Sequence, residues 1–111
     1  MKKTRVYSLA TKEAVLLLGK EIKLARVERK WSLDNLAERV GISRVTLQKI
    51  EAGEMSSSIG LVFETAILVG VPLFEYDNQQ RIATNIDLVQ SKIALFPKRT
   101  RTKKKAVDDD F

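Results

Sequence analysis

Two short segments with the same layout, 32–40 and 43–52, constrain the fold of this chain more than any other feature. Each begins with a serine, Ser32 or Ser43, whose side chain can cap the first turn of a helix. Apolar residues then recur at spacings of three and four, which is the period of one buried helix face. Gly41 lies between them and can adopt the left-handed conformation that ends a helix. The pattern predicts two short helices joined by a tight turn.

Apolar residues immediately before the two serines support these helix starts. Trp31 and Leu36 have the spacing of a hydrophobic staple around the first serine, and Ile42 and Leu47 have it around the second. An exposed tryptophan can also serve as a stacking platform for a nucleic-acid base. We expect Trp31 to act as a staple or core residue.

The buried faces of the two segments determine which side of the helix over 44–52 is exposed to solvent. Ala37 lies where the helices approach most closely, and Val40, Leu47 and Ile50 pack the second helix against the first. This is the layout of a helix-turn-helix, in which the N-terminal half of the second helix can enter the major groove of DNA. The residues expected to point outward are Ser43, Arg44, Val45, Thr46, Gln48 and Lys49.

These outward side chains match the chemistry of base edges. Arg and Lys donate to guanine O6 and N7, Gln pairs with adenine, and Val or a Thr methyl group contacts the thymine methyl. The amides near Ser32, Leu33 and Asp34 begin the first helix and can bind a phosphate, and Ser43 is a further expected backbone contact. Asp34 either orients a basic neighbour or caps the helix.

A longer helix is expected ahead of this unit, from a cap at Thr11 to about Lys30. Its apolar stripe consists of Val15, Leu18, Ile22 and Ala25. Its other face is charged and expected to face solvent, with Lys20, Lys23, Arg26, Glu28 and Arg29.

Three further helices are expected after the second segment, over 59–69, over 73 to about 79, and over 84–95 with Thr84 or Asn85 as cap. The first of them is apolar on nearly all sides, so it must be buried on more than one side. We therefore expect it to contribute to a dimer interface together with the start of the next helix. The residues expected there are Phe63, Ile67, Leu73 and Phe74.

Composition narrows the function classes. The chain has no cysteine and no histidine, which excludes disulfides and thiolate metal sites and removes the commonest general base. It also lacks a glycine-rich phosphate loop and a kinase signature. We expect no enzymatic activity, no metal and no cofactor.

The net charge of +6 favours a polyanionic partner. The apolar runs are too short to cross a bilayer, which predicts a cytoplasmic protein without a membrane partner.

The two ends of the chain differ from its centre. Residues 1–10 form a short basic arm, which either enters a minor groove or is simply solvated. Residues 97–111 hold six cations and three anions, so they cannot form a core and read as a flexible tail. The tail either solubilises the chain or binds DNA or a protein partner through Lys98, Arg99, Arg101, Lys103 and Phe111. Between the ends we place a DNA-binding and dimerisation domain over 11–80 and a helical extension over 81–96.

Residues 17–76 resemble the XRE family of phage-repressor-like helix-turn-helix proteins. The resemblance rests on LGKEIKLARVERKWSLDNLAERVGISRVTLQKIEAGE and on VPLFE further along. It implies an all-α protein with a five-helix repressor-like domain, here followed by an additional short helix and the charged tail. It also implies a homodimer that binds an inverted-repeat operator, with Arg44, Val45 and Lys49 as base-reading residues and Thr46 and Gln48 as the next candidates for base contacts. Glu54 departs from the basic or polar residue common there, which puts one backbone contact in doubt.

The C-terminal part is similar to HipB-type antitoxins, which often end in a basic stretch and a short acidic-hydrophobic terminus. The stretch that carries this similarity is LFPKRTRTKKKAVDDDF. The similarity implies an autoregulating repressor whose partner is a HipA-like serine/threonine kinase toxin. Two alternatives remain: a stand-alone phage-type or host regulator without a toxin, and a protein-interaction module whose helix-turn-helix no longer binds DNA.

Overall fold

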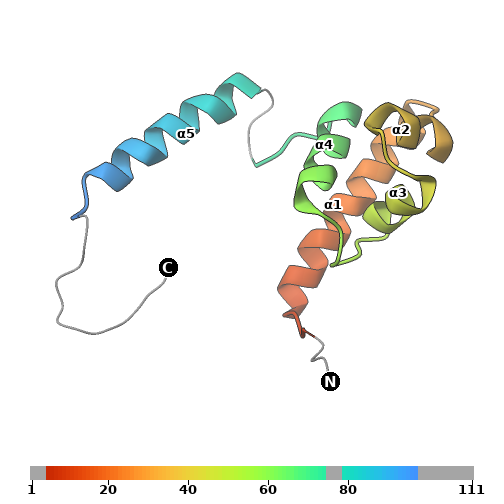
Figure 1. The fold of residues 1–111 in the computed structure, drawn as a ribbon, viewed down its shortest axis with the longest axis horizontal. Coiled ribbons are helices and arrows are strands. Elements are labelled where there is room, and N and C mark those ends of the chain that lie inside the picture. The colour runs from red at the N-terminus through yellow and green to blue at the C-terminus, as the bar shows by residue number, and fades with distance from the viewer. Residues whose placement is uncertain (1–4, 75–78, 98–111) are drawn as a thin grey trace. The chain divides into compact units, whose positions relative to one another are not determined.

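The computed structural model describes residues 5–74 and 79–97, and every regular element in these ranges is a helix. The chain divides into two compact units, 1–75 and 76–111. The first unit contains α1 (Leu9–Glu28), α2 (Leu33–Val40), α3 (Arg44–Glu51) and α4 (Ile59–Val69), and the second contains α5 (Gln79–Ala94) (Figure 1). The expected all-α fold is confirmed.

The serine-capped helices lie where the sequence predicts them. The Ser32 hydroxyl accepts a hydrogen bond from the backbone N–H of Asn35 at 3.0 Å, and the Ser43 hydroxyl accepts one from Thr46 at 3.0 Å. Gly41 ends α2 with φ at +87°, in the left-handed region that glycine adopts without a steric penalty. Both caps and the turn are therefore local consequences of the residues at these positions.

The core of the first unit lies where its four helices meet. α1 packs against α3 and α4, and α2 packs against the same two helices. Ile22, Leu36, Leu47 and Ala66 are completely buried, one from each helix. Ala37 is also buried, as expected for the close contact between α2 and α3. The core thereby fixes the inner side of α3 and leaves its outer side to solvent.

The start of α1 differs from the expectation. Its cap is Ser8, which accepts a hydrogen bond from the Thr11 backbone N–H at 3.2 Å, so Thr11 lies inside the first turn and is not the cap. Two hydroxyl residues three positions apart can each cap a helix, and the upstream one extends it when the intervening residues are helical. The helix therefore includes Leu9 and Ala10, which were assigned to the N-terminal arm.

The C-terminal helices also differ from the expectation. Leu73 and Phe74 are not helical, and residues 75–78 lie outside the described ranges, so the helix expected from 73 is absent from its described part. α5 begins at Gln79, ahead of the expected caps Thr84 and Asn85, both of which lie inside the helix. The Asn85 amide instead donates to the Arg81 carbonyl at 2.9 Å. The preceding Gln, Arg and Ala residues are good helix formers, which accounts for the earlier start.

Over the described ranges, no helix is both long enough and apolar enough to cross a bilayer.

Candidate nucleic-acid interface

The two sides of α3 have opposite character. Leu47, Ile50 and Glu51 are buried against the other helices. Arg44, Val45, Gln48 and Lys49 are exposed, and Thr46 is half-buried. The Thr46 Oγ1 also accepts a hydrogen bond from the Ser43 hydroxyl at 2.9 Å, so its oxygen is engaged at the cap. The expected base-reading residues thus share one outer face, with Thr46 at its edge.

An ion pair joins the starts of α2 and α3. The Arg44 Nη1 lies 3.7 Å from the Asp34 Oδ2, and both side chains are largely exposed. Of the two roles left open for Asp34, the geometry favours orientation of a basic neighbour, because the α2 cap is formed by Ser32. An exposed pair of this length contributes little to stability, so its effect is on where the guanidinium points.

The expected backbone contacts lie at two helix starts. Ser32 and Ser43 are exposed and serve as caps, and Leu33 is half-buried in the first turn of α2. A helix N-terminus carries partial positive charge on its first amides, which favours a phosphate nearby. The two starts are connected through the Asp34–Arg44 pair, so they belong to one surface.

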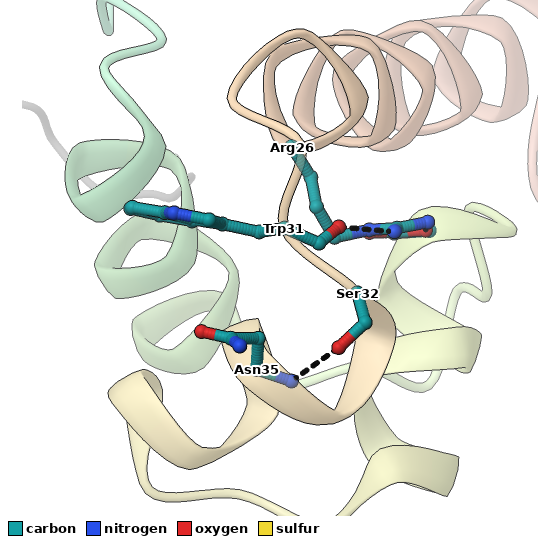
Figure 2. A network of polar contacts seen from close by, with 5 residues as sticks. Arg26, Trp31, Ser32 and Asn35 are labelled. Atoms are coloured by element: carbon teal, nitrogen blue, oxygen red, sulfur yellow. Dashed lines mark hydrogen bonds and ion pairs between the residues drawn. The ribbon is translucent and has the colours of Figure 1, made fainter.

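A buried arginine network holds this surface in place. The Arg26 Nε donates to Glu51 Oε2 at 2.7 Å, and its Nη2 donates to Glu51 Oε1 at 3.1 Å. Its Nη1 donates to the Trp31 carbonyl at 2.9 Å, next to the Ser32–Asn35 cap (Figure 2). Three elements meet at one guanidinium: α1, the segment before α2, and the end of α3.

The assignment of Arg26 to the solvent-facing side of α1 was therefore wrong. Only 8% of this residue is exposed, because its guanidinium has a buried carboxylate partner. The sequence held a signal: Gly19, Ile22 and Arg26 have spacings of three and four, so they share one helix face. A charged residue on that face indicates a buried pair, and Glu51 is the partner that sequence spacing alone does not reveal.

Gly19 allows α1 to contact the end of α3 through backbone atoms. A Cβ at this position would lie 2.6 Å from the Ile50 carbonyl oxygen and 2.8 Å from that of Glu51. Only glycine fits between the two helices at this distance. Together with the Arg26–Glu51 pair, the contact sets the position of the C-terminal end of α3.

Trp31 is half-buried. Two guanidinium groups lie over its ring, that of Arg39 at 4.1 Å and that of Arg29 at 5.3 Å from the centroid. The Arg39 Nε also donates to Asn35 Oδ1 at 3.2 Å, and the Arg29 Nε donates to the Val69 carbonyl at 2.9 Å. The indole thus connects α2 to the end of α4 through cation–π contacts. Its use as a stacking platform stays untested.

The residues expected at a dimer interface separate into two groups. Leu73 is 8% exposed and belongs to the core of the first unit. Phe63 is half-buried, Ile67 is exposed, and Phe74 is exposed, with the two phenyl rings edge to face at 6.4 Å between centroids. We call Phe63, Ile67 and Phe74 the aromatic surface. It presents apolar area to solvent in the single chain.

The charged tail contributes five further candidate residues. Lys98, Arg99, Arg101, Lys103 and Phe111 of the tail lie outside the described residues. Within 5–74 and 79–97, no three acidic, histidine or cysteine side chains are grouped closely enough to bind a metal ion.

Comparison with known proteins identifies the central part of the chain. Residues 22–76 match the family described as helix-turn-helix, and they include all of α2, α3 and α4 and the last turns of α1. The match covers just under half of the chain, and this segment is similar to helix-turn-helix domains.

The chain is also similar to a named regulator, the HTH-type transcriptional regulator SutR of Escherichia coli (strain K12). The two are 33% identical over 67 residues, which is 60% of this chain and 38% of that protein. No solved structure matches the chain significantly. These similarities concern the helix-turn-helix domain and do not bear on the narrower resemblance to antitoxins.

Proposed function

We propose that this protein is a sequence-specific DNA-binding transcriptional repressor without enzymatic activity. The observation that carries the proposal is the division of α3 into a buried side and an exposed side. Leu47, Ile50 and Glu51 anchor the helix, while Arg44 and Lys49 extend from it. The similarity to a regulator of transcription supports the same role. A cytoplasmic location follows from action on chromosomal DNA.

In the proposed binding mode, the N-terminal ends of α2 and α3 make different kinds of contact with DNA. The first turn of α2 binds a phosphate, which sets the register of the protein on the duplex. α3 then lies in the major groove, where Arg44, Val45, Gln48 and Lys49 contact base edges. In the free protein Arg44 faces Asp34, so its guanidinium is already turned toward the surface shared by the two helices.

The repressor is proposed to act as a homodimer on an inverted repeat. The aromatic surface supplies the contact, because Phe63, Ile67 and Phe74 gain from burial against the same residues of a second copy. A two-fold pair places its two recognition helices in successive major grooves, roughly 34 Å apart.

Removing a base contact tests the proposed binding mode. Arg44→Ala and Lys49→Ala are each expected to cost about 1–3 kcal/mol of binding free energy on the preferred sequence and to relax its sequence preference. Thermal stability stays unchanged, because both side chains are exposed. The preferred sequence is first selected from a random duplex library, and affinity is then measured by fluorescence anisotropy over a range of salt concentrations.

Lys23→Ala is the matched control, since Lys23 is an exposed cation on α1 and is not among the proposed DNA contacts. It should leave sequence preference intact. An Arg44→Ala variant that binds the selected sequence as tightly as the wild type would show that α3 is placed wrongly. A selection that enriches no sequence would favour the protein-interaction module.

The narrower role, an autoregulating antitoxin with a HipA-like kinase partner, rests on the similarity of the C-terminal sequence alone. Its test is purification of the tagged chain expressed together with the genes that adjoin it. Co-purification of a kinase-like protein, and its loss when residues 97–111 are deleted, would support the antitoxin role. A chain that binds its own upstream DNA and retains no partner is a stand-alone regulator.

A further inference from the structure

The helix of the second unit, α5, carries a row of exposed apolar side chains. Ile82, Ile86, Val89, Ile93 and Phe96 follow one another at spacings of four, three, four and three. Ile82 is half-buried, and exposure of the others ranges from 53% at Val89 to 72% at Phe96. Phe96 lies in the turn that follows the helix, and its backbone N–H donates to the Ile93 carbonyl at 3.0 Å.

This spacing keeps the row on one side of the helix. Alternation of four and three is also the spacing of a coiled-coil seam, and the row follows it through five positions. A helix of 16 residues is also marginal in water by itself, so its stability depends on burial of this row. The row therefore needs a partner helix that runs along α5.

We propose that the partner is α5 of a second copy of this chain, packed antiparallel. The proposal concerns self-association of the second unit and goes beyond DNA binding by the first. With Ile82 opposite Ile93 of the other copy and Ile86 opposite Val89, the two rows pair over residues 82–93, and Phe96 lies beyond the paired part. The arrangement has two-fold symmetry, so the same surface is used by both copies.

The residues that flank the row are compatible with self-pairing. In the antiparallel arrangement Asn85 lies beside Lys92 of the other copy on one edge, and Ala83 lies beside Gln90 on the other. No like charges meet, and the Asn85 side-chain oxygen can accept from the lysine ammonium. A charged seam position would specify a different partner, and this row has none.

Charges that adjoin the helix in sequence favour the antiparallel direction. Glu75 and Asp77 precede α5, and the run of six cations that begins at Lys98 follows it. Parallel pairing would bring both cationic runs to the same end. Antiparallel pairing instead sets the two helix ends that precede these runs about 24 Å apart, at 1.5 Å per residue over 16 residues, which exceeds the Debye length of about 8 Å at physiological salt.

Two adjacent residues give a matched test. Val89 lies in the row and Leu88 lies beside it, and both are 53% exposed in the single chain. An aspartate at either position therefore stays solvated in the monomer. In the proposed pair only the Val89 side chain becomes buried, where an unpaired carboxylate is strongly disfavoured.

The measurement is sedimentation equilibrium of the full-length chain without DNA. Val89→Asp is expected to weaken self-association by at least tenfold, and Leu88→Asp by less than threefold. Equal association constants for the two variants would overturn the proposal, as would a wild-type chain that stays monomeric. Because no DNA is present, the result does not depend on whether the proposed DNA binding is correct.

Cross-linking tests the direction and reports on α5 even if the aromatic surface also holds two copies together. The chain has no cysteine, so single-cysteine variants are unambiguous. A tagged Ile82→Cys chain mixed with an untagged Ile93→Cys chain should form a tagged–untagged disulfide on mild oxidation, and each variant by itself should not. Cross-links within each variant alone would overturn the antiparallel pairing, and absence of any cross-link would overturn pairing through this row.

Discussion

Replacement of Glu51 by alanine is expected to lower the free energy of unfolding by about 3–5 kcal/mol. The Arg26 guanidinium would keep its buried position but lose the two hydrogen bonds that it donates to the carboxylate. A buried charge without a partner carries a large desolvation cost. Urea denaturation of the wild type and of Glu51→Ala gives the difference directly. A loss of this size is a large part of the 5–15 kcal/mol that typically stabilises a domain.

The control removes both charges. The double substitution of Arg26 and Glu51 by methionine should recover most of the lost stability, because apolar pairs of similar volume often replace buried ion pairs without loss. Some deficit should remain, since the Trp31 carbonyl also accepts from Arg26. A single variant as stable as the wild type, or a double variant no more stable than the single one, would contradict this account of the network.

Gly19→Ala is expected to destabilise the domain by about 1–3 kcal/mol. Helix propensity alone predicts the opposite, since alanine in a helix is favoured over glycine by roughly 1 kcal/mol. The added methyl group would lie 2.6 Å from the Ile50 carbonyl oxygen, and a backbone atom cannot move aside as a flexible side chain can. Thermal unfolding followed by circular dichroism at 222 nm measures the change.

Gly60→Ala is the matched control for this prediction. Gly60 also lies in a helix, and the nearest atom to its added Cβ is the Ser58 hydroxyl at 4.0 Å. It should therefore be neutral or stabilising by about 0.5 kcal/mol. If both variants were equally stable, the close approach of α1 to the end of α3 would be refuted.

The sequence predicted the helix pair α2–α3 well because its signals are local. Each helix has a serine that accepts from the amide three residues later, and Gly41 has the left-handed conformation that its position requires. Such contacts lie within a few residues of one another, so spacing is enough to find them. The exposed residues of α3 could be predicted in the same way, because helix periodicity places them on the side opposite its buried residues.

The features that the sequence did not predict depend on contacts between residues far apart in the chain, or on a choice between two residues that could serve the same role. Helix periodicity can indicate that Arg26 lies on a buried face, but its partner Glu51 lies 25 residues further along the chain and cannot be found in this way. Ser8 and Thr11 offer the same cap chemistry, and nothing local selects between them. Leu73 resembles an interface residue in sequence, and only the fold shows that it packs inside the unit.

The two sides of α3 have separate roles, and this affects which substitutions the domain can accept during evolution. The side chains on its outer face take no part in the core, while Leu47, Ile50 and Glu51 hold the helix from behind. Substitutions at Val45 or Gln48 can therefore accumulate with little loss of folding stability. Under the proposed binding mode, a lineage carrying this domain can acquire a new target sequence in single steps, and each intermediate remains a folded protein.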